Sequence, residues 1–272
     1  MTKIGKNGMD PISDQEYLKK EQYRQGDHLD ARIQLHRRFS VNPSNYFEWM
    51  YDLLDLRAGM PVMEVGCGTG EIWHTNQRRL PAELQVTMLD LSTGMAGSAR
   101  AVLNSDARFD FAAADVQRLP FSTGQFERVL ANYMLYHVPD ISLAVRELRR
   151  VLAPGGRLCA ATNSAGHMQE LGDLMNRFGL MRSELHDFAA RYGLENAPAI
   201  LGESFEHVEV IPFIDSLFVT ETRALLDYIR SMVGIWDFPP GAQEEITAWV
   251  NAEIQTNGGF TIHKASGAVL AW

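Results

Sequence analysis

Cysteine, positive charge and long apolar runs are all scarce in this chain of 272 residues. Its two cysteines, Cys67 and Cys159, are too few for a disulfide framework, so a reducing compartment is expected. No apolar run approaches the about 18 residues that a membrane-spanning helix needs. Residues 1–13 lack the apolar core of a signal peptide, and no cysteine or histidine spacing is typical of a zinc site. These absences favour a cytoplasmic protein that binds neither a metal ion nor a membrane.

The charge balance is acidic, with 25 Lys and Arg against 34 Asp and Glu and a formal net charge of −9. Binding to a nucleic acid backbone depends on clustered Lys and Arg, so nucleic acid is not expected as the main partner. A local basic patch would still allow a tRNA or rRNA substrate. The hydrophobic share of 46% is that of a globular protein, and the length suits one large α/β domain with an appended cap.

The stretch from Val62 to Gly70 combines a short apolar segment with three alternating glycines. It predicts a buried parallel strand that runs into a tight turn, with a helix to follow. Ligands of doubly wound α/β folds bind at the carboxyl ends of the strands, so the turn predicts a nucleotide-like site. The spacing differs from a dinucleotide fingerprint, because Glu71 stands where the third glycine would be needed. A P-loop is excluded too, because no Gly-Lys-Ser/Thr follows.

This E-x-G-x-G-x-G pattern resembles motif I of the class I S-adenosylmethionine (SAM)-dependent methyltransferases. SAM has a cationic sulfonium and no phosphate, so a turn without a phosphate cradle beside an acid suits it. The resemblance implies that SAM is the cofactor and S-adenosylhomocysteine the product. It assigns five residues of the motif to cofactor binding: Glu64, Gly66, Cys67, Gly68 and Gly70. A glycine-rich turn that binds no ligand is the alternative.

A second apolar run, residues 85–90, ends on Asp90. An acid that binds ribose is expected about 20 residues beyond the glycines, at the end of the second strand. Ser92 follows as a predicted helix cap. The resemblance implies that Asp90 binds the ribose hydroxyls, that Leu91 belongs to the cofactor site, and that Met95 packs on the adenine. The alternative for Asp90 is a simple charge at a helix N-terminus.

Three later segments extend the resemblance, which spans residues 58–164. In the family an Asp lies near the adenine amino group, and the backbone amide of the next residue meets the ring. The end of the fourth strand, here residues 126–132, lies beside the methyl group. The late motif of the family is matched by a helix that stops at Pro154-Gly155-Gly156 and by a fifth strand. Four positions join the cofactor site on this basis: Asp115, Val116, Asn132 and Tyr133.

The resemblance implies a doubly wound, Rossmann-like α/β sheet of seven strands whose last strand is antiparallel. We place residues 260–271 in that last strand, between the fifth and sixth strands. The chain is then divided into four parts: residues 1–57 as an N-terminal helical lid, 58–164 as the SAM-binding core, 165–204 as an inserted helical substrate cap, and 205–272 as the completion of the core sheet with helices over 221–256.

Residues 14–40 carry helical runs rich in charge and tyrosine. In related methyltransferases such helices fold over SAM, so Tyr17 and Tyr23 are expected to lie at the cofactor, the alternative being a surface helix. The polar helices also leave open a homo-oligomer in which they cover a neighbouring subunit. The dipeptide Asn42-Pro43 predicts the cap and first turn of a helix that packs on the sheet.

Beyond the core, the pattern predicts a helix over residues 167–190 and a strand over 205–219. The aromatic loop 235–240 either lines an acceptor pocket or is a plain packed loop.

His137 follows the fourth strand and is the candidate catalytic residue. Methyl transfer to a hydroxyl, a phenol or an acidic carbon needs a base, and an imidazole with a pKa near about 6.5 suits neutral pH. The alternative is a histidine that holds the strand end by hydrogen bonds. The sequence thus predicts a SAM-dependent methyltransferase acting on O, N or C of a small-molecule metabolite or natural product. A methyltransferase acting on RNA or protein, and a SAM-binding protein without methyl transfer, are the alternatives.

Overall fold

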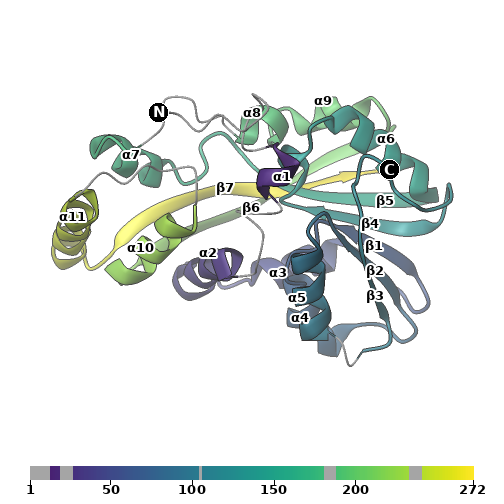
Figure 1. Ribbon diagram of the computed structural model, residues 1–272, viewed down its shortest axis with the longest axis horizontal. Helices are drawn as coiled ribbons and strands as arrows, with labels where there is room; N and C mark the ends of the chain where they lie inside the picture. The colour runs from purple at the N-terminus through teal and green to yellow at the C-terminus, as the bar shows by residue number, and fades with distance from the viewer. Residues whose placement is uncertain (1–12, 19–26, 104–105, 181–187, 233–240) are drawn as a thin grey trace.

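One twisted sheet runs through the molecule, with helices on both of its faces (Figure 1). The computed structural model describes residues 13–18, 27–103, 106–180, 188–232 and 241–272. Within these residues the sheet has seven strands in the order β3-β2-β1-β4-β5-β7-β6. The strands are β1 (Pro61–Val65), β2 (Gln85–Asp90), β3 (Phe109–Ala113), β4 (Phe126–Asn132), β5 (Leu152–Asn163), β6 (Val208–Val219) and β7 (Phe260–Ala271).

Strands β1 to β5 pair in parallel, whereas β7 pairs antiparallel with both β5 and β6. The predicted place of residues 260–271 between the fifth and sixth strands is therefore confirmed, and so is the Rossmann-like fold class. Strand order reverses between β1 and β4, which is the switch point where doubly wound sheets bind ligands. A ligand is therefore expected at the carboxyl edge of β1, β2 and β4.

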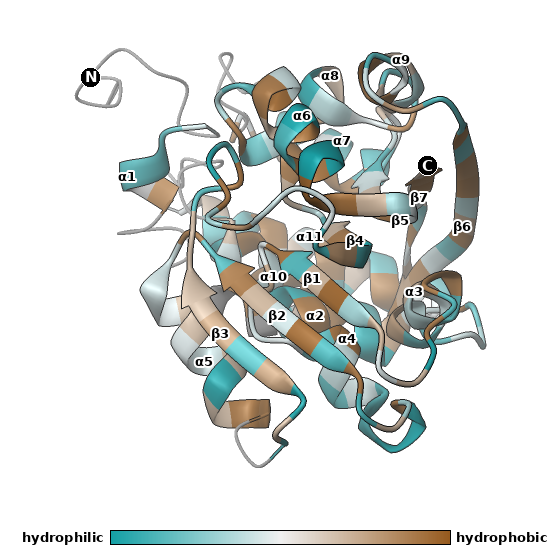
Figure 2. Cartoon of the chain, turned by 90° about the vertical axis from the view of Figure 1, so that its right-hand side faces the viewer, coloured by the Kyte–Doolittle hydropathy of each residue, from teal (hydrophilic) through white to brown (hydrophobic). Residues whose placement is uncertain are grey.

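Helices cover the sheet on both sides, as a mainly parallel sheet requires. Those around the core are α3 (Tyr46–Leu53), α4 (Glu71–Thr75), α5 (Thr93–Leu103), α6 (Ile141–Val151), α8 (Phe188–Tyr192) and α9 (Ala197–Gly202), with the short 3-10 helices η2 (Gln77–Arg79) and η3 (Leu135–His137). Figure 2 shows hydrophobic residues along the central strands and hydrophilic residues on the outer surface of α6. Among the described residues, no helix has the length and apolar character needed to cross a membrane.

Strands β6 and β7 are long and continue beyond the rest of the sheet (Figure 1). Their outer halves meet α2 (Asp27–Phe39), α7 (Gln169–Arg177), α10 (Thr222–Ser231) and α11 (Ala242–Asn257). These elements share a hydrophobic cluster of their own, which includes Leu35, Leu217 and Ile229. The N-terminal helix α2 is thus packed against the C-terminal part of the chain.

The predicted helix cap at Asn42-Pro43 is wrong. Helix α3 begins at Tyr46, and its cap is Asn45, whose side chain accepts the Phe47 N–H at 2.8 Å. The Asn42 side chain instead donates to the carbonyl of Ile214 at 2.8 Å, because the chain just before it pairs with β6. A strand contact distant in sequence thus outweighs the local capping preference.

The predicted helix over residues 167–190 is too long. Helix α7 ends where Gly179 adopts φ +65°. The Gly179 N–H donates to the carbonyl of Asn176 at 3.0 Å, and the Leu180 N–H to that of Met175 at 2.9 Å. This is a Schellman motif, a helix end for which glycine is favoured at the left-handed position. A second helix, α8, begins at Phe188, and the aromatic loop 235–240 lies outside the described residues.

Leu148 of α6 is 0% exposed and lies in the larger core cluster. We expect Leu148→Ala to lower the free energy of unfolding by about 2–5 kcal/mol, because it removes buried contacts and leaves a cavity. The control on the same helix is Arg146→Ala, at an exposed position where a change within about 0.5 kcal/mol is expected. Urea unfolding of both variants measures this. Equal destabilisation by the two variants would contradict the packing described.

Candidate functional site

The turn between β1 and α4 depends on glycine at each alternate position. Gly66, Gly68 and Gly70 have φ of +67°, +54° and +79°, which side chains rarely adopt. A Cβ on Gly66 would lie 2.7 Å from the Cβ of Met134, and one on Gly68 would lie 3.0 Å from Leu29. The turn is therefore closely covered from two sides. Cys67 between them is buried, and burial raises the pKa of its thiol.

Asp90 joins this turn to the end of β2. Its carboxylate accepts the Gly68 N–H at 3.0 Å and the Ser92 N–H at 2.8 Å. Burial raises the pKa of Asp90 above its ordinary value, and the backbone N–H groups of Ser92 and Gly68 offset part of this rise. Ser92 caps α5 as predicted, through its hydroxyl and the N–H of Met95 at 3.3 Å. The Met95 side chain is 1% exposed and so is enclosed within the protein.

Glu64 lies at the end of β1, beneath the turn. It is 3% exposed, and its carboxylate accepts the indole N–H of Trp73 at 2.6 Å. Burial raises the pKa of Glu64 to about 8, an effect that the Trp73 hydrogen bond reduces and that Asp90 adds to. Two acidic side chains with raised pKa values thus stand side by side at the carboxyl ends of β1 and β2. A cationic ligand group nearby would favour the ionised forms of both side chains and lower these pKa values.

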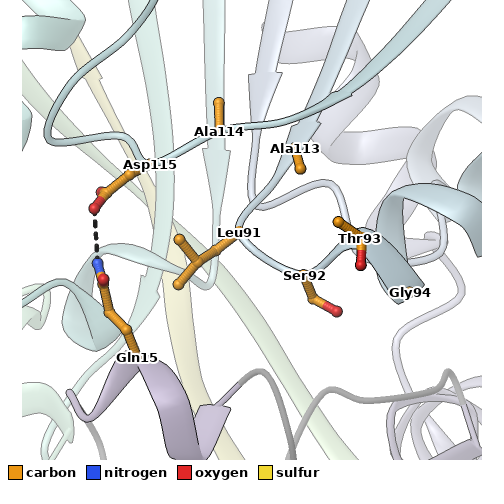
Figure 3. Close-up of a pocket in the computed structure, with 8 residues that line it drawn as sticks. All are labelled: Gln15, Leu91, Ser92, Thr93, Gly94, Ala113, Ala114 and Asp115. Carbon is orange, nitrogen blue, oxygen red and sulfur yellow. Dashed lines mark hydrogen bonds between the residues drawn. The ribbon is translucent and has the colours of Figure 1, made fainter.

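A pocket of about 520 Å³ opens beside Asp90, within the size range of small-molecule sites. Its walls are residues 91–94 after β2, residues 113–115 at the end of β3, and Gln15 of the short helix α1 (Gln15–Tyr17). Figure 3 shows the Gln15 amide directed at Asp115, and its Nε2 donates to Asp115 Oδ2 at 2.9 Å. Leu91 and Asp115 therefore line the pocket, whereas the Val116 side chain packs in the core.

The end of β4 carries Asn132 and Tyr133 on the other side of β1. The Tyr46 hydroxyl donates to Asn132 Oδ1 at 2.7 Å, and the rings of Tyr46 and Tyr133 are 5.6 Å apart. Tyr133 has φ +52°, a conformation that a bulky residue adopts only under constraint from its surroundings, often at functional sites. Burial raises the pKa of both tyrosines, so their hydroxyls remain protonated donors at neutral pH.

His137 closes η3, directly after this strand end. Its ring packs edge-on against Tyr136 at 4.6 Å between ring centroids and against Phe188 of α8 at 5.7 Å. The side chain is partly exposed. The imidazole thus stands between the end of β4 and α8, within an aromatic wall.

Three residues of the N-terminal segment contact residues of the site or of the helix beside it. Gln15 contacts Asp115, Leu29 lies over Gly68, and Arg37 forms an ion pair with Glu71 at 2.9 Å. Tyr23 lies outside the described residues, and so does the side chain of Tyr17. Neither Gln15 nor Tyr46 is among the site residues expected from the sequence. No local pattern marks either residue, because their partners are 100 and 86 positions away in the chain.

The sheet order, the glycine turn after β1 and the acid that ends β2 define a Rossmann-like fold with a nucleotide-type site. Residues 63–160 match the family model described as "Methyltransferase domain". The chain therefore contains a methyltransferase domain of the class I, S-adenosylmethionine-dependent type.

Curated relatives agree with this family. The chain is 36% identical over 115 residues to a malonyl-[acyl-carrier protein] O-methyltransferase of Erwinia billingiae, covering 42% of this chain and 43% of the relative. It is 35% identical over 117 residues to methyltransferase GfsG of Streptomyces halstedii, covering 42% of this chain and 41% of the relative. The matched segment thus spans less than half the length of either relative.

A solved structure shares the fold over nearly the whole chain. It is a Haemonchus contortus phosphoethanolamine N-methyltransferase 2 bound to phosphomonomethylethanolamine and S-adenosylhomocysteine. The TM-score is 0.59 at 18% sequence identity, and the alignment covers 97% of this chain and 60% of the other. At such a low sequence identity, the likeness shows only that the two proteins share a fold.

The raised pKa of Glu64 makes the free energy of unfolding depend on pH. A carboxyl group whose pKa is raised to about 8 by folding keeps its proton in the folded state, while the unfolded chain loses it near 4.5. The stability that this group contributes is full below about pH 4.5 and is lost as the pH rises through 8. We expect Glu64→Gln, which is neutral at every pH, to become increasingly stable relative to the unaltered protein between pH 5 and 8. Urea unfolding at several pH values measures this, and a constant difference would contradict it.

Proposed function

We propose that this protein transfers the methyl group of SAM to O, N or C of a small-molecule metabolite or natural product. The observation that carries the proposal is the Asp90 carboxylate, which holds the glycine turn and is followed directly by Leu91, a wall residue of the pocket of about 520 Å³. Support comes from the methyltransferase family model and from relatives whose names are those of methyltransferases.

The residues fit the parts of SAM in a definite order. The amino acid head is placed at the glycine turn, where a Cβ on Gly66 or Gly68 would collide with Met134 or press on Leu29, so a larger residue would displace these covering side chains. Glu64 lies beneath, and the cationic groups of SAM would favour the ionised form of its carboxyl group, whose pKa burial raises to about 8. Asp90 then binds the ribose hydroxyls, while Leu91 and Asp115 enclose the adenine. In this proposal residues 1–57 form a lid over the cofactor, and residues 165–204 form a substrate cap.

In this proposal the sulfonium of SAM supplies the electrophile, so the protein mainly orients the acceptor and excludes water. Asn132 and Tyr133 stand where the acceptor meets the methyl group, and the Tyr46 hydroxyl fixes the orientation of the Asn132 amide. His137 takes the proton from acceptors that must lose one. An imidazole suits this role because it changes protonation near neutral pH.

The direct test uses methyl-labelled SAM, the purified protein and an extract of the source cells. The products are separated into acid-soluble and acid-precipitable fractions. Label in the soluble fraction is expected and gives a compound to identify by mass. Label in the precipitate would move the assignment to an RNA or protein acceptor. SAM binding without label in either fraction would favour a SAM-binding protein without methyl transfer.

Asp90→Ala tests the cofactor site. It removes the acceptor of the proposed ribose hydrogen bonds and the support of Gly68, so we expect SAM to bind more weakly by about 1–3 kcal/mol in calorimetry. Asp110→Ala is the matched control, since it removes one negative charge from an exposed position on the neighbouring strand β3. If the Asp110 variant loses as much affinity, the effect is a general one of charge and the assignment of Asp90 is wrong.

His137→Ala separates the two roles of the histidine. A base acts on the acceptor, so its loss is expected to lower turnover by about 10²-fold or more while SAM affinity changes little. Turnover is measured by transfer of label and affinity by calorimetry on the same preparation. A parallel loss of both would assign His137 to holding the strand end.

A further inference from the structure

Four polar side chains meet where α2 and the segment before α7 lie against strands β6 and β7. They are His36, His167, Asp215 and Lys264, called here the Lys264 cluster. The Lys264 Nζ and Asp215 Oδ2 are 2.7 Å apart, and the two side chains are 7% and 0% exposed. Burial lowers the pKa of both histidines, that of His167 to about 3, and the Lys264 ammonium lowers both further. The cofactor site uses none of these groups.

Both carboxylate oxygens of Asp215, the acidic residue of the cluster, already accept hydrogen bonds from neighbouring groups. Asp215 Oδ2 accepts from Lys264 Nζ at 2.7 Å and from the Ser40 hydroxyl at 2.7 Å. Its Oδ1 accepts the backbone N–H groups of Asn42 at 3.0 Å and of Ser216 at 2.8 Å. A carboxylate offers about four lone-pair sites, so Asp215 is saturated.

The donors of the cluster exceed these acceptors. An ammonium has three N–H groups, and Lys264 directs one of them to Asp215. His167 Nδ1 accepts the Ala265 N–H at 3.2 Å, so the neutral ring carries its proton on Nε2. His36 Nδ1 is enclosed and has no hydrogen-bond partner among the described residues. With its proton on Nδ1, His36 is a donor like the remaining N–H groups of Lys264. Buried polar groups are normally paired, so these unpaired groups indicate a ligand that brings acceptor oxygens.

The cluster is continuous with the end of β4 where the methyl acceptor is proposed to bind. The Phe213 ring lies 5.5 Å from Lys264 Nζ on one side and 5.4 Å from the Tyr46 ring on the other. Tyr46 in turn bonds Asn132. The cofactor pocket lies beside β2 and β3, at one end of the strand order. The cluster lies on β7 and β6, at the other end. The cluster therefore stands on the acceptor side.

The backbone register supports the same placement. Ser266 of β7 pairs with Asn163, which ends β5, and lies two residues from Lys264. Two residues along a strand span about 7 Å, so Lys264 is within the reach of a small molecule that extends from the carboxyl edge. His36 and His167 are both partly exposed, which gives a ligand an approach to the cluster.

We propose that the Lys264 cluster binds an anionic oxygen group, a carboxylate or a phosphate, which the methyl acceptor carries at a distance from the atom that is methylated. The ammonium supplies the charge, and the two imidazoles supply directed N–H donors. The Phe213 ring and its aromatic neighbours form the wall along which the rest of the acceptor lies. This inference rests on the proposed function for the identity of the ligand as a methyl acceptor.

The test follows the imidazole nitrogens by NMR in protein labelled with ¹⁵N-histidine, with His36→Gln and His167→Gln used to assign the two signals. Hexanoate and hexyl phosphate are the probes, and hexanol is the uncharged control at equal ionic strength. We expect saturable shifts of the His36 and His167 signals with at least one anion and none with hexanol. The anion that binds more tightly identifies the group as carboxylate or phosphate. Equal shifts with hexanol, or no shift with either anion, would overturn the proposal.

The matched variant changes both charges of the ion pair, Lys264→Met with Asp215→Asn. Changing Lys264 alone would leave a buried carboxylate without its cation and would destabilise the fold. The double variant is expected to bind the anion about tenfold more weakly or worse, because charge-assisted hydrogen bonds are lost. His36→Phe keeps the edge contact with Tyr228 and is expected to weaken binding by a smaller factor. An unchanged midpoint in the double variant would overturn the proposal.

SAM is also titrated into each sample by calorimetry. This measurement distinguishes failure of the anion-site inference from failure of the proposed function. SAM binding without any anion-dependent shift would overturn the inference and leave the proposed function intact. Anion binding without SAM binding would overturn the proposed function and support the cluster as an anion site.

Discussion

The hydrogen bonds from Asp90 to the N–H groups of Gly68 and Ser92 are the interactions on which the site depends. They join the turn after β1 to the turn after β2, so that the two loops are held as one rigid edge. The cost is a buried carboxylate, and the backbone N–H groups offset part of it. A ligand that replaces water around this carboxylate must bring donors of its own. In the proposed function, the vicinal hydroxyls of the SAM ribose provide them.

A second constraint comes from the long strands β6 and β7. Because they continue past the parallel core, they need helices of their own, and α2 from the start of the chain supplies one of them. Arg32 of α2 donates to the carbonyl of Ser231 at 2.6 Å, while Leu29 of the same helix lies over Gly68. One helix thus contacts both the glycine turn and the C-terminal helices. Movement of α2 would affect the cofactor site and the Lys264 cluster together.

Local pattern predicted the central elements well, because their signals are short-range. The apolar run and the three glycines of residues 62–70 describe a strand and a turn whose φ values only glycine adopts readily. The helix over residues 167–190 was predicted too long, although Gly179 is a helix-end signal that the apolar spacing outweighed. The Asn42 cap was wrong for a different reason: pairing of the preceding residues with β6 decides what that side chain contacts.

The sequence by itself determined the fold class, the glycine turn and the order of the acids along the chain, since periodicity and residue type are local properties. Only the tertiary structure decided which groups meet. Gln15 reaches Asp115, Tyr46 reaches Asn132, and two histidines from separate segments gather around Lys264. The physical reason is that these contacts depend on how helices pack on the sheet, and packing responds to shape and volume summed over many residues. No short stretch of sequence carries that information.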